Sequence, residues 1–485
     1  MQKSKYSSSV FETGALHLGI IFLFISLVFF YFTPVINRGA WRLDLSIWAN
    51  LTDVLPVFAG LCCAYCFFAL LTENIRIAFF GAVCHAFSSG NILLVGNEQF
   101  TQVWAIACMP LLLAGFLLIT RKKYVLGGFL FALSVFLELL ICSVNVIYYL
   151  SVFCIIMYAG CAFNLISRKD IKTFFLITLT FSVALSLAVF PCTTDFYSNN
   201  RMGEENGFFE TDFQSSSNRK TWSYAKEEAL CLIIPNIRGG ASVSILKQDS
   251  RLFKEHKLNH KRTGVKIQTC TYWGNLPFSS GPVYAGACVC FLFILGMFII
   301  KNKIKWWILA AVLFLILASG GKNWTIVNDF LLKYLPMYEN YRNPSSAMLI
   351  LATIFPLIAA WGLKTLFHHR NMIEKRRLKL HLFISLGLTI AICLFFYLLP
   401  NVIYNFKSPN DTRFILKYPE WYYGALVTDR LNLLKMDALR SVAFILASGG
   451  SVFFFIKRNK KGLNKYVIIL IVLVIIDLWM VDKRY

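Results

Sequence analysis

The sequence has few charged residues: Asp, Glu, Lys and Arg make up only 15% of its 485 residues. Hydrophobic residues make up 57% of the chain, and its mean hydropathy is +0.61. These values exclude an ordinary soluble domain, in which about 25% of residues are charged, and they indicate a polytopic membrane protein. The chain also lacks internal repeats, linkers and low-complexity tracts. We therefore expect a single membrane domain over residues 1–485.

Acidic residues are especially scarce, with 25 Asp and Glu against 48 Lys and Arg and a net charge of +23. Such an excess can indicate nucleic-acid binding, but here the basic residues gather in short loops between alternate apolar runs. This placement follows the positive-inside rule, so we expect a cytoplasmic N-terminus, an extracytoplasmic C-terminus and no nucleic-acid partner. The clusters lie at 121–123, 168–172, 301–305, 370–379 and 457–461.

Apolar runs near the roughly 20 residues that a membrane helix needs recur along the whole chain. They predict an all-α polytopic membrane protein with about thirteen transmembrane helices. The small polar residues Ser88–Asn91 indicate a break in the third helix or a close helix contact. The predicted spans lie near 16–37, 54–72, 75–96, 100–120, 124–142, 144–165, 172–191, 281–300, 304–320, 345–366, 380–400, 439–456 and 465–481.

The one long polar segment between apolar runs, 193–280, is predicted to be an extracytoplasmic loop that forms a subdomain. Long loops are usually functional or disordered, and its aromatic, Pro and Gly content favours a folded, functional one. Its densest motifs lie at 222–240 and 272–284. The basic tract 247–266 between them is typical of a solvated, mobile insertion, or alternatively attracts phosphate or an acidic polymer. Three cysteines in or beside the loop, Cys192, Cys231 and Cys270, allow one disulfide at most.

Several single residues are candidates for chemistry. Asp44, just beyond the first apolar run, could act as a general base or hold a metal, or it could simply pair with a nearby Arg. Glu138 lies within a membrane segment, where carboxylates are costly and usually face a cavity or a partner. Arg342, just before a span, could hold a lipid-linked phosphate bidentately or snorkel to headgroups. The sequence shows no metal-ligand set, since His256 and His260 lack a third ligand.

Taken together, the motifs resemble the YfhO-type bacterial membrane proteins, particularly the forms found in Bacteroidetes. Members are regarded as glycosyltransferase-C-like and take sugars from a polyprenyl-phosphate carrier on the outer face of the inner membrane. The similarity covers most of the chain. It lies in Pro110–Gly115, Lys123–Gly128, Trp222–Tyr224 with Glu228, Ile234–Asn236, Gly239–Gly240, Tyr272–Gly274, Pro277–Phe278, Ser280–Tyr284, Gly321–Asn323, Tyr341–Arg342, Asp429–Arg430, Asp437 and Arg440–Ser441.

The resemblance implies a multi-pass protein of the bacterial inner membrane that moves a sugar from the carrier to an envelope glycan or lipid acceptor. Asp44 would then be the catalytic base and Glu228 a second acid. Arg342 would hold the donor phosphate, with a divalent metal ion as a cofactor left open. The other substrate contacts would be Trp222, Tyr224, Trp273, Tyr284 and Arg430.

The chain departs from the family pattern in three ways. Its first outer loop is much shorter than that of the family. Two stretches that contain His in the family correspond to Gly96–Phe100 and Cys142–Asn145 in this sequence, which lack His. The sequence ends at Tyr485, where family members continue into an outer domain. These departures leave enzyme activity open. The alternative expectation is a non-catalytic transporter of lipid-linked glycans, or an assembly partner.

Overall fold

The fold is described from a computed structural model. It describes residues 17, 19–28, 46–141, 144–199, 222–245, 248–260, 268–335, 338, 343–369, 375–408, 411, 419–457 and 463–485.

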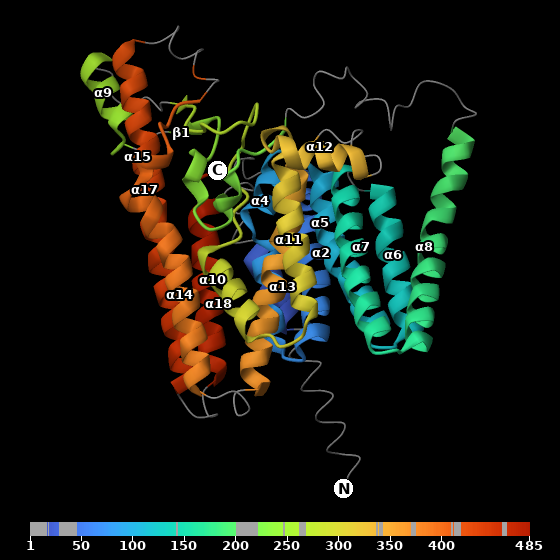
Figure 1. Cartoon of the computed structure of the whole chain (residues 1–485). Helices are drawn as coiled ribbons and strands as arrows, with labels where there is room; N and C mark the ends of the chain where they lie inside the picture. The colour runs from blue at the N-terminus through green and yellow to red at the C-terminus, as the bar shows by residue number, and fades with distance from the viewer. Residues whose placement is uncertain are drawn as a thin grey trace.

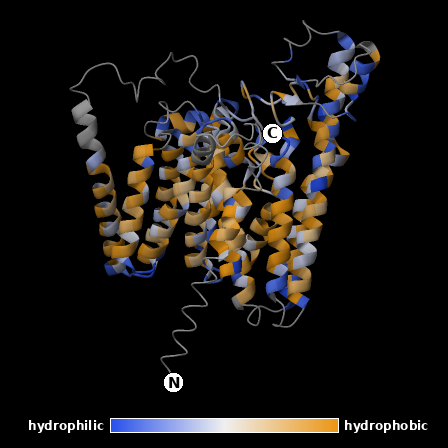
Figure 2. Cartoon of the chain, turned by 180° about the vertical axis from the view of Figure 1, so that it is seen from behind, coloured by the Kyte–Doolittle hydropathy of each residue, from blue (hydrophilic) through white to orange (hydrophobic). Residues whose placement is uncertain are grey.

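The described chain consists mainly of long helices that run side by side (Figure 1). Apolar residues cover their middle parts and hydrophilic residues gather at the two ends, as expected for helices that cross a bilayer (Figure 2). The helices are α2 (Ser46–Thr72), α3 (Ile75–Ala86), α4 (Ser89–Gly96), α5 (Phe100–Thr120), α6 (Tyr124–Ile141), α7 (Val144–Ser167), α8 (Ile171–Asn199), α9 (Arg251–His260), α10 (Ala287–Ile299), α11 (Ile304–Ser319), α12 (Thr325–Tyr334), α13 (Ser346–His369), α14 (Lys375–Leu398), α15 (Pro400–Ile403), α17 (Glu420–Lys457) and α18 (Leu463–Asp482).

Within the described residues, nine helices are long and apolar enough to cross a membrane, and the bent pair α3–α4 could form a tenth span. Three further apolar helices are shorter: Gly19–Val28, α10 and α11. Each of the thirteen predicted spans overlaps one of these helices or the bent pair. The polytopic membrane fold is therefore confirmed, whereas the number of spans and the likeness to glycosyltransferase-C folds stay predictions.

The predicted break in the third span is confirmed. Helix α3 ends at Ala86, α4 begins at Ser89, and the two axes differ by 44°. The Asn91 side chain donates hydrogen bonds to the carbonyl oxygens of His85 (2.9 Å) and Ala86 (3.3 Å). It therefore satisfies carbonyl groups that the broken helix leaves without their usual partners.

The helices differ greatly in how much of their surface is covered. In α13, 94% of an apolar 18-residue stretch is buried, whereas only 22% of the corresponding stretch of α6 is buried. Helix α13 thus forms part of the core, while α6, α7 and α8 form one edge of the bundle (Figure 1).

Helices α5 and α6 approach closely through two glycines. A Cβ atom at Gly127 would lie 2.7 Å from the backbone nitrogen of Ile119, and a Cβ atom at Gly115 would lie 2.6 Å from the backbone nitrogen of Phe131. Small residues permit such approach between membrane helices.

The turns that carry the first two basic clusters lie at the same end of the bundle. Lys122, after α5, and Asp170, after α7, are 3.9 Å apart between Nζ and Oδ2. This end is opposite the polar loop segment 222–286 (Figure 1). The arrangement agrees with the charge pattern, and the assignment of the two ends to cytoplasm and exterior stays a prediction.

One predicted boundary is wrong. The span predicted at 439–456 is only the C-terminal part of a longer helix, because α17 begins at Glu420 and continues for 38 residues. Its first half carries charged residues that lower the local hydropathy, although its buried positions recur with helical spacing. At about 1.5 Å per residue the helix is about 57 Å long, well beyond the roughly 30 Å of a hydrocarbon core. Its N-terminal part therefore projects beyond the other spans (Figure 1).

Candidate functional site

We call the described parts of 222–286 the outer subdomain, after their predicted location. Its elements are two 3₁₀ turns, η3 (Glu228–Leu232) and η4 (Pro235–Arg238), helix α9, and a two-stranded antiparallel sheet of β1 (Ser244–Ile245) and β2 (Gln268–Thr269). The unit packs on α17: the Ser441 hydroxyl donates to the Ile233 carbonyl at 2.7 Å. The described residues of the segment thus have defined secondary structure, and the predicted subdomain stays a prediction.

Glu228, a predicted catalytic acid, lies inside the outer subdomain and is 3% exposed. Its carboxylate accepts hydrogen bonds from the Tyr272 hydroxyl (2.7 Å) and from the Ala225 backbone N–H (2.9 Å). Burial outweighs these two stabilising contacts and raises the pKa of Glu228 from 4.5 to about 7. The subdomain thus holds an acid whose protonation changes near neutral pH, which is a property of groups that transfer protons.

The four aromatic residues predicted as substrate contacts differ in their exposure. Trp222 is 37% exposed, whereas Tyr224, Trp273 and Tyr284 are buried. The Arg238 guanidinium lies 4.3 Å from the centre of the Trp273 ring, and that ring also packs edge-on against Tyr404. Of these four residues, Trp222 therefore offers the most accessible face to a ligand.

Arg430, predicted as a substrate contact, is fully buried instead. It forms a bidentate pair with Asp411, with Nη1–Oδ2 and Nη2–Oδ1 distances of 2.7 and 2.9 Å. The same guanidinium donates to the carbonyl oxygens of Phe406, Cys270 and Tyr272. Arg430 therefore ties three chain segments together.

Asp429, next to Arg430, contacts the basic tract. Its carboxylate accepts hydrogen bonds from the backbone N–H groups of Arg251 (2.7 Å) and Leu252 (2.9 Å), at the start of α9. The Leu252 side chain is fully buried. The prediction of a mobile insertion is thus wrong for 251–260, which is a capped helix docked on α17, while 261–267 lies outside the described residues.

A buried ionic network joins the outer subdomain to α17 and α18, and its contacts between residues distant in sequence were not predicted. Asp437 pairs bidentately with Arg484 at 2.8 and 2.9 Å, and it also accepts the Asn236 backbone N–H. Asp477 accepts the Tyr284 hydroxyl at 2.7 Å and lies 3.4 Å from Nη1 of Arg440. The available signal was the carboxylate of Asp477 within a predicted span, since such groups usually have a partner.

Two predicted site residues cannot be placed relative to Glu228, because Asp44, the predicted base, and Arg342, the predicted phosphate ligand, lie outside the described residues. Within the described part of the chain, no group of three or more His, Cys, Asp or Glu could hold a metal ion. Cys231 and Cys270 are free thiols, and burial raises the pKa of Cys270.

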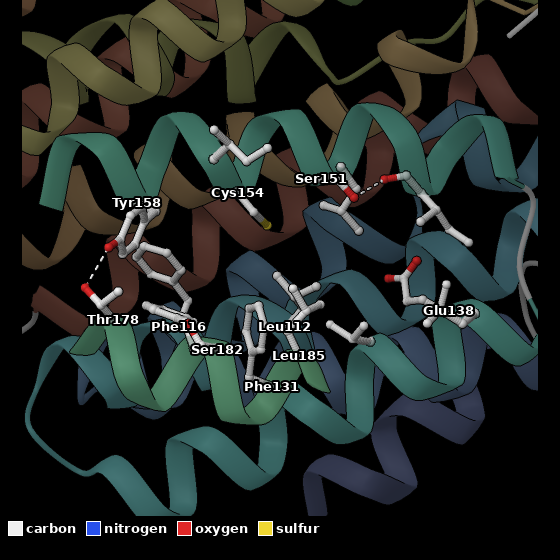
Figure 3. Close-up of a pocket in the computed structure, with 16 residues that line it drawn as sticks. Leu112, Phe116, Phe131, Glu138, Ser151, Cys154, Tyr158, Thr178, Ser182 and Leu185 are labelled. Carbon is white, nitrogen blue, oxygen red and sulfur yellow. Dashed lines mark hydrogen bonds between the residues drawn. The ribbon is translucent and has the colours of Figure 1, made fainter. Parts of the chain in front are cut away.

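A second candidate site is a cavity of about 390 Å³ between α5, α6, α7 and α8 (Figure 3). Its size lies within the range of small-molecule sites, and its wall is largely apolar. Glu138 lies at one end, and the Tyr158–Thr178 pair lies at the other. Glu138 belonged to no predicted site, although its position within a span had marked it as a candidate.

The raised pKa of Glu228 gives a testable dependence of stability on pH. Between about pH 4.5 and 7 the folded protein holds a proton that the unfolded chain releases, so the free energy of unfolding should fall as pH rises through this interval. Glu228→Gln should remove this contribution, which amounts to about 1.4 kcal/mol for each unit by which the pKa is raised. Thermal unfolding in detergent across the interval would measure the pH dependence, with Glu227→Gln as control. An unchanged slope in Glu228→Gln would contradict the assignment.

No family model, curated protein or solved structure matches this chain.

Proposed function

We propose that this protein is a membrane glycosyltransferase-like protein that moves a sugar from a polyprenyl-phosphate carrier to an envelope glycan or lipid acceptor. The reaction would take place on the outer face of the bacterial inner membrane. The observation that carries the proposal is Glu228, an acid with a pKa of about 7 in a folded subdomain beside the membrane helices. A pKa near the working pH suits a group that exchanges protons with a substrate.

In this mechanism Asp44 takes the proton from an acceptor hydroxyl. The acceptor oxygen bonds to the anomeric carbon of the sugar, and the bond between that carbon and the carrier phosphate breaks. Arg342 stabilises the phosphate that leaves with the lipid, Trp222 offers its exposed face to the sugar, and Glu228 is the second acid.

One observation favours a non-catalytic alternative. Glu228, Tyr224, Trp273, Tyr284 and Arg430 are all buried, and the carboxylate of Glu228, the hydroxyl of Tyr284 and the guanidinium of Arg430 bind other parts of the protein. These five residues stabilise the fold in the described state, which would suit a transporter of lipid-linked glycan or an assembly partner equally well.

The test compares envelope glycans of cells with and without the protein, and of cells that carry Asp44→Asn, Glu228→Gln or the control Glu227→Gln. For an enzyme we expect a loss of about 100-fold or more in sugar transfer for the first two variants and none for the control. Glycans that need the protein but tolerate both variants would favour the assembly partner. Unchanged glycans without the protein would contradict both roles.

A further inference from the structure

The cavity between α5 and α8 lies on the least covered side of the bundle. Among its lining residues, Leu139, Ile155 and Leu185 have exposed side chains, with exposed fractions of 37%, 64% and 49%. They belong to helices predicted to cross the membrane, so their exposed surface would face lipid. The cavity is therefore accessible to molecules that enter from the bilayer.

The cavity is long enough to take a hydrocarbon chain. Its lining extends along α7 from Ile147 to Tyr158, which is about 16 Å at the helical rise of 1.5 Å per residue. Phe116, Phe131 and Phe181 contribute aromatic surface. An apolar cavity of this shape next to lipid suits a single aliphatic or isoprenoid chain.

The polar groups of the cavity are of two kinds. Three hydroxyls are satisfied internally: Tyr158 pairs with Thr178 at 2.7 Å at the far end, and Ser151, on the side of Glu138, donates to the Ile147 carbonyl at 2.8 Å (Figure 3). Glu138 is different, because neither of its carboxyl oxygens has a hydrogen-bond partner among the described residues, although its side chain is only 2% exposed. A buried polar group of this kind calls for a ligand that satisfies it.

The surroundings of Glu138 define what that ligand can be. In the described part of the chain no Lys, Arg or His pairs with it, and an isolated carboxylate in an apolar interior is very costly. The uncharged carboxylic acid has one donor and one acceptor, so a hydroxyl group, which can both donate and accept, matches it. A phosphate would bring negative charge without a cation to balance it.

We propose that this cavity binds a lipid alcohol, with the chain between α6, α7 and α8 and the hydroxyl paired to Glu138 (Figure 3). The site is separate from the outer subdomain and needs no charged headgroup. It does not depend on the glycosyl transfer proposed above.

The test uses the full-length protein in lipid nanodiscs and a long-chain alcohol that carries a photoreactive diazirine on its chain. We expect crosslinks to lining residues such as Ile155 and Leu185, and competition by dodecanol but not by dodecane or dodecyl phosphate. Glu138→Leu should weaken binding about tenfold, as expected for the loss of a buried hydrogen-bonded pair. Glu138→Gln, which still donates and accepts, should bind nearly as well as the original protein.

A pair of Leu→Trp variants provides the control. Leu185→Trp fills the cavity and should abolish crosslinking, whereas Leu126→Trp places the same ring on an exposed part of α6 outside the cavity and should not. Equal competition by dodecane, stronger competition by dodecyl phosphate, or unchanged binding in both Glu138→Leu and Leu185→Trp would each overturn the proposal. Because the readout is binding alone, its failure would leave the proposed transferase activity untouched.

Discussion

Replacement of Arg430 by alanine is expected to lower the free energy of unfolding by about 3–5 kcal/mol. The substitution leaves the buried carboxylate of Asp411 without its bidentate partner, and it removes the donor to the carbonyl oxygens of Phe406, Cys270 and Tyr272. Thermal or denaturant unfolding in detergent would measure the loss. Lysine should not rescue it, because one ammonium group cannot reproduce the planar fork of the guanidinium.

Arg251→Ala is the matched control for this prediction. The Arg251 side chain is 61% exposed and pairs with Glu255 across one helical turn, so its loss should change stability by less than about 0.5 kcal/mol. A loss in Arg430→Ala no larger than in Arg251→Ala would show that the buried pair does not hold the segments together.

Asp477→Ala is expected to have a comparable effect, again about 3–5 kcal/mol, at the contact between α18 and the outer subdomain. The Tyr284 hydroxyl and the Cys288 backbone N–H lose their acceptor, and the half-buried Arg440 loses a nearby carboxylate. Asp477→Asn should cost less, because an amide oxygen can still accept the hydroxyl.

Limited proteolysis of Asp477→Ala would distinguish release of the outer subdomain from unfolding of the whole protein. We expect cleavage within 222–286 to become faster than cleavage elsewhere, since this aspartate contacts the segment where the outer subdomain leads into α10. Asp329→Ala, at an exposed position on α12, serves as control. Proteolysis that is equally fast in the two variants would argue against a docking role for Asp477.

The sequence predicts the membrane helices well because hydropathy is a local property. A run of apolar residues is costly to expose wherever it occurs, so each predicted span overlaps an apolar helix. The start of α17 was missed for the same reason, since Asp429, Arg430 and Asp437 lower the hydropathy of a segment whose partners are distant in sequence.

The candidate site is less predictable, because it depends on which polar groups meet. Arg430 was expected to contact substrate, yet Asp411 lies beside it, and no local pattern specifies that pairing. The cavity at Glu138 arises from the spacing between α6, α7 and α8, and sequence alone does not give that spacing. The sequence did indicate that a carboxylate within a membrane span usually faces a cavity or a partner.

The contacts between the outer subdomain and the last two helices also set an order of events during synthesis. The Asn236–Asp437 hydrogen bond joins residues 201 positions apart, and the Tyr284–Asp477 bond joins residues 193 apart. At roughly 5–20 residues per second, translation reaches these partners about 10–40 s after it passes the outer subdomain. During that interval Asn236 and Tyr284 lack the acids that later bind them, so the nascent subdomain is most vulnerable to proteases and misassembly before α17 and α18 arrive.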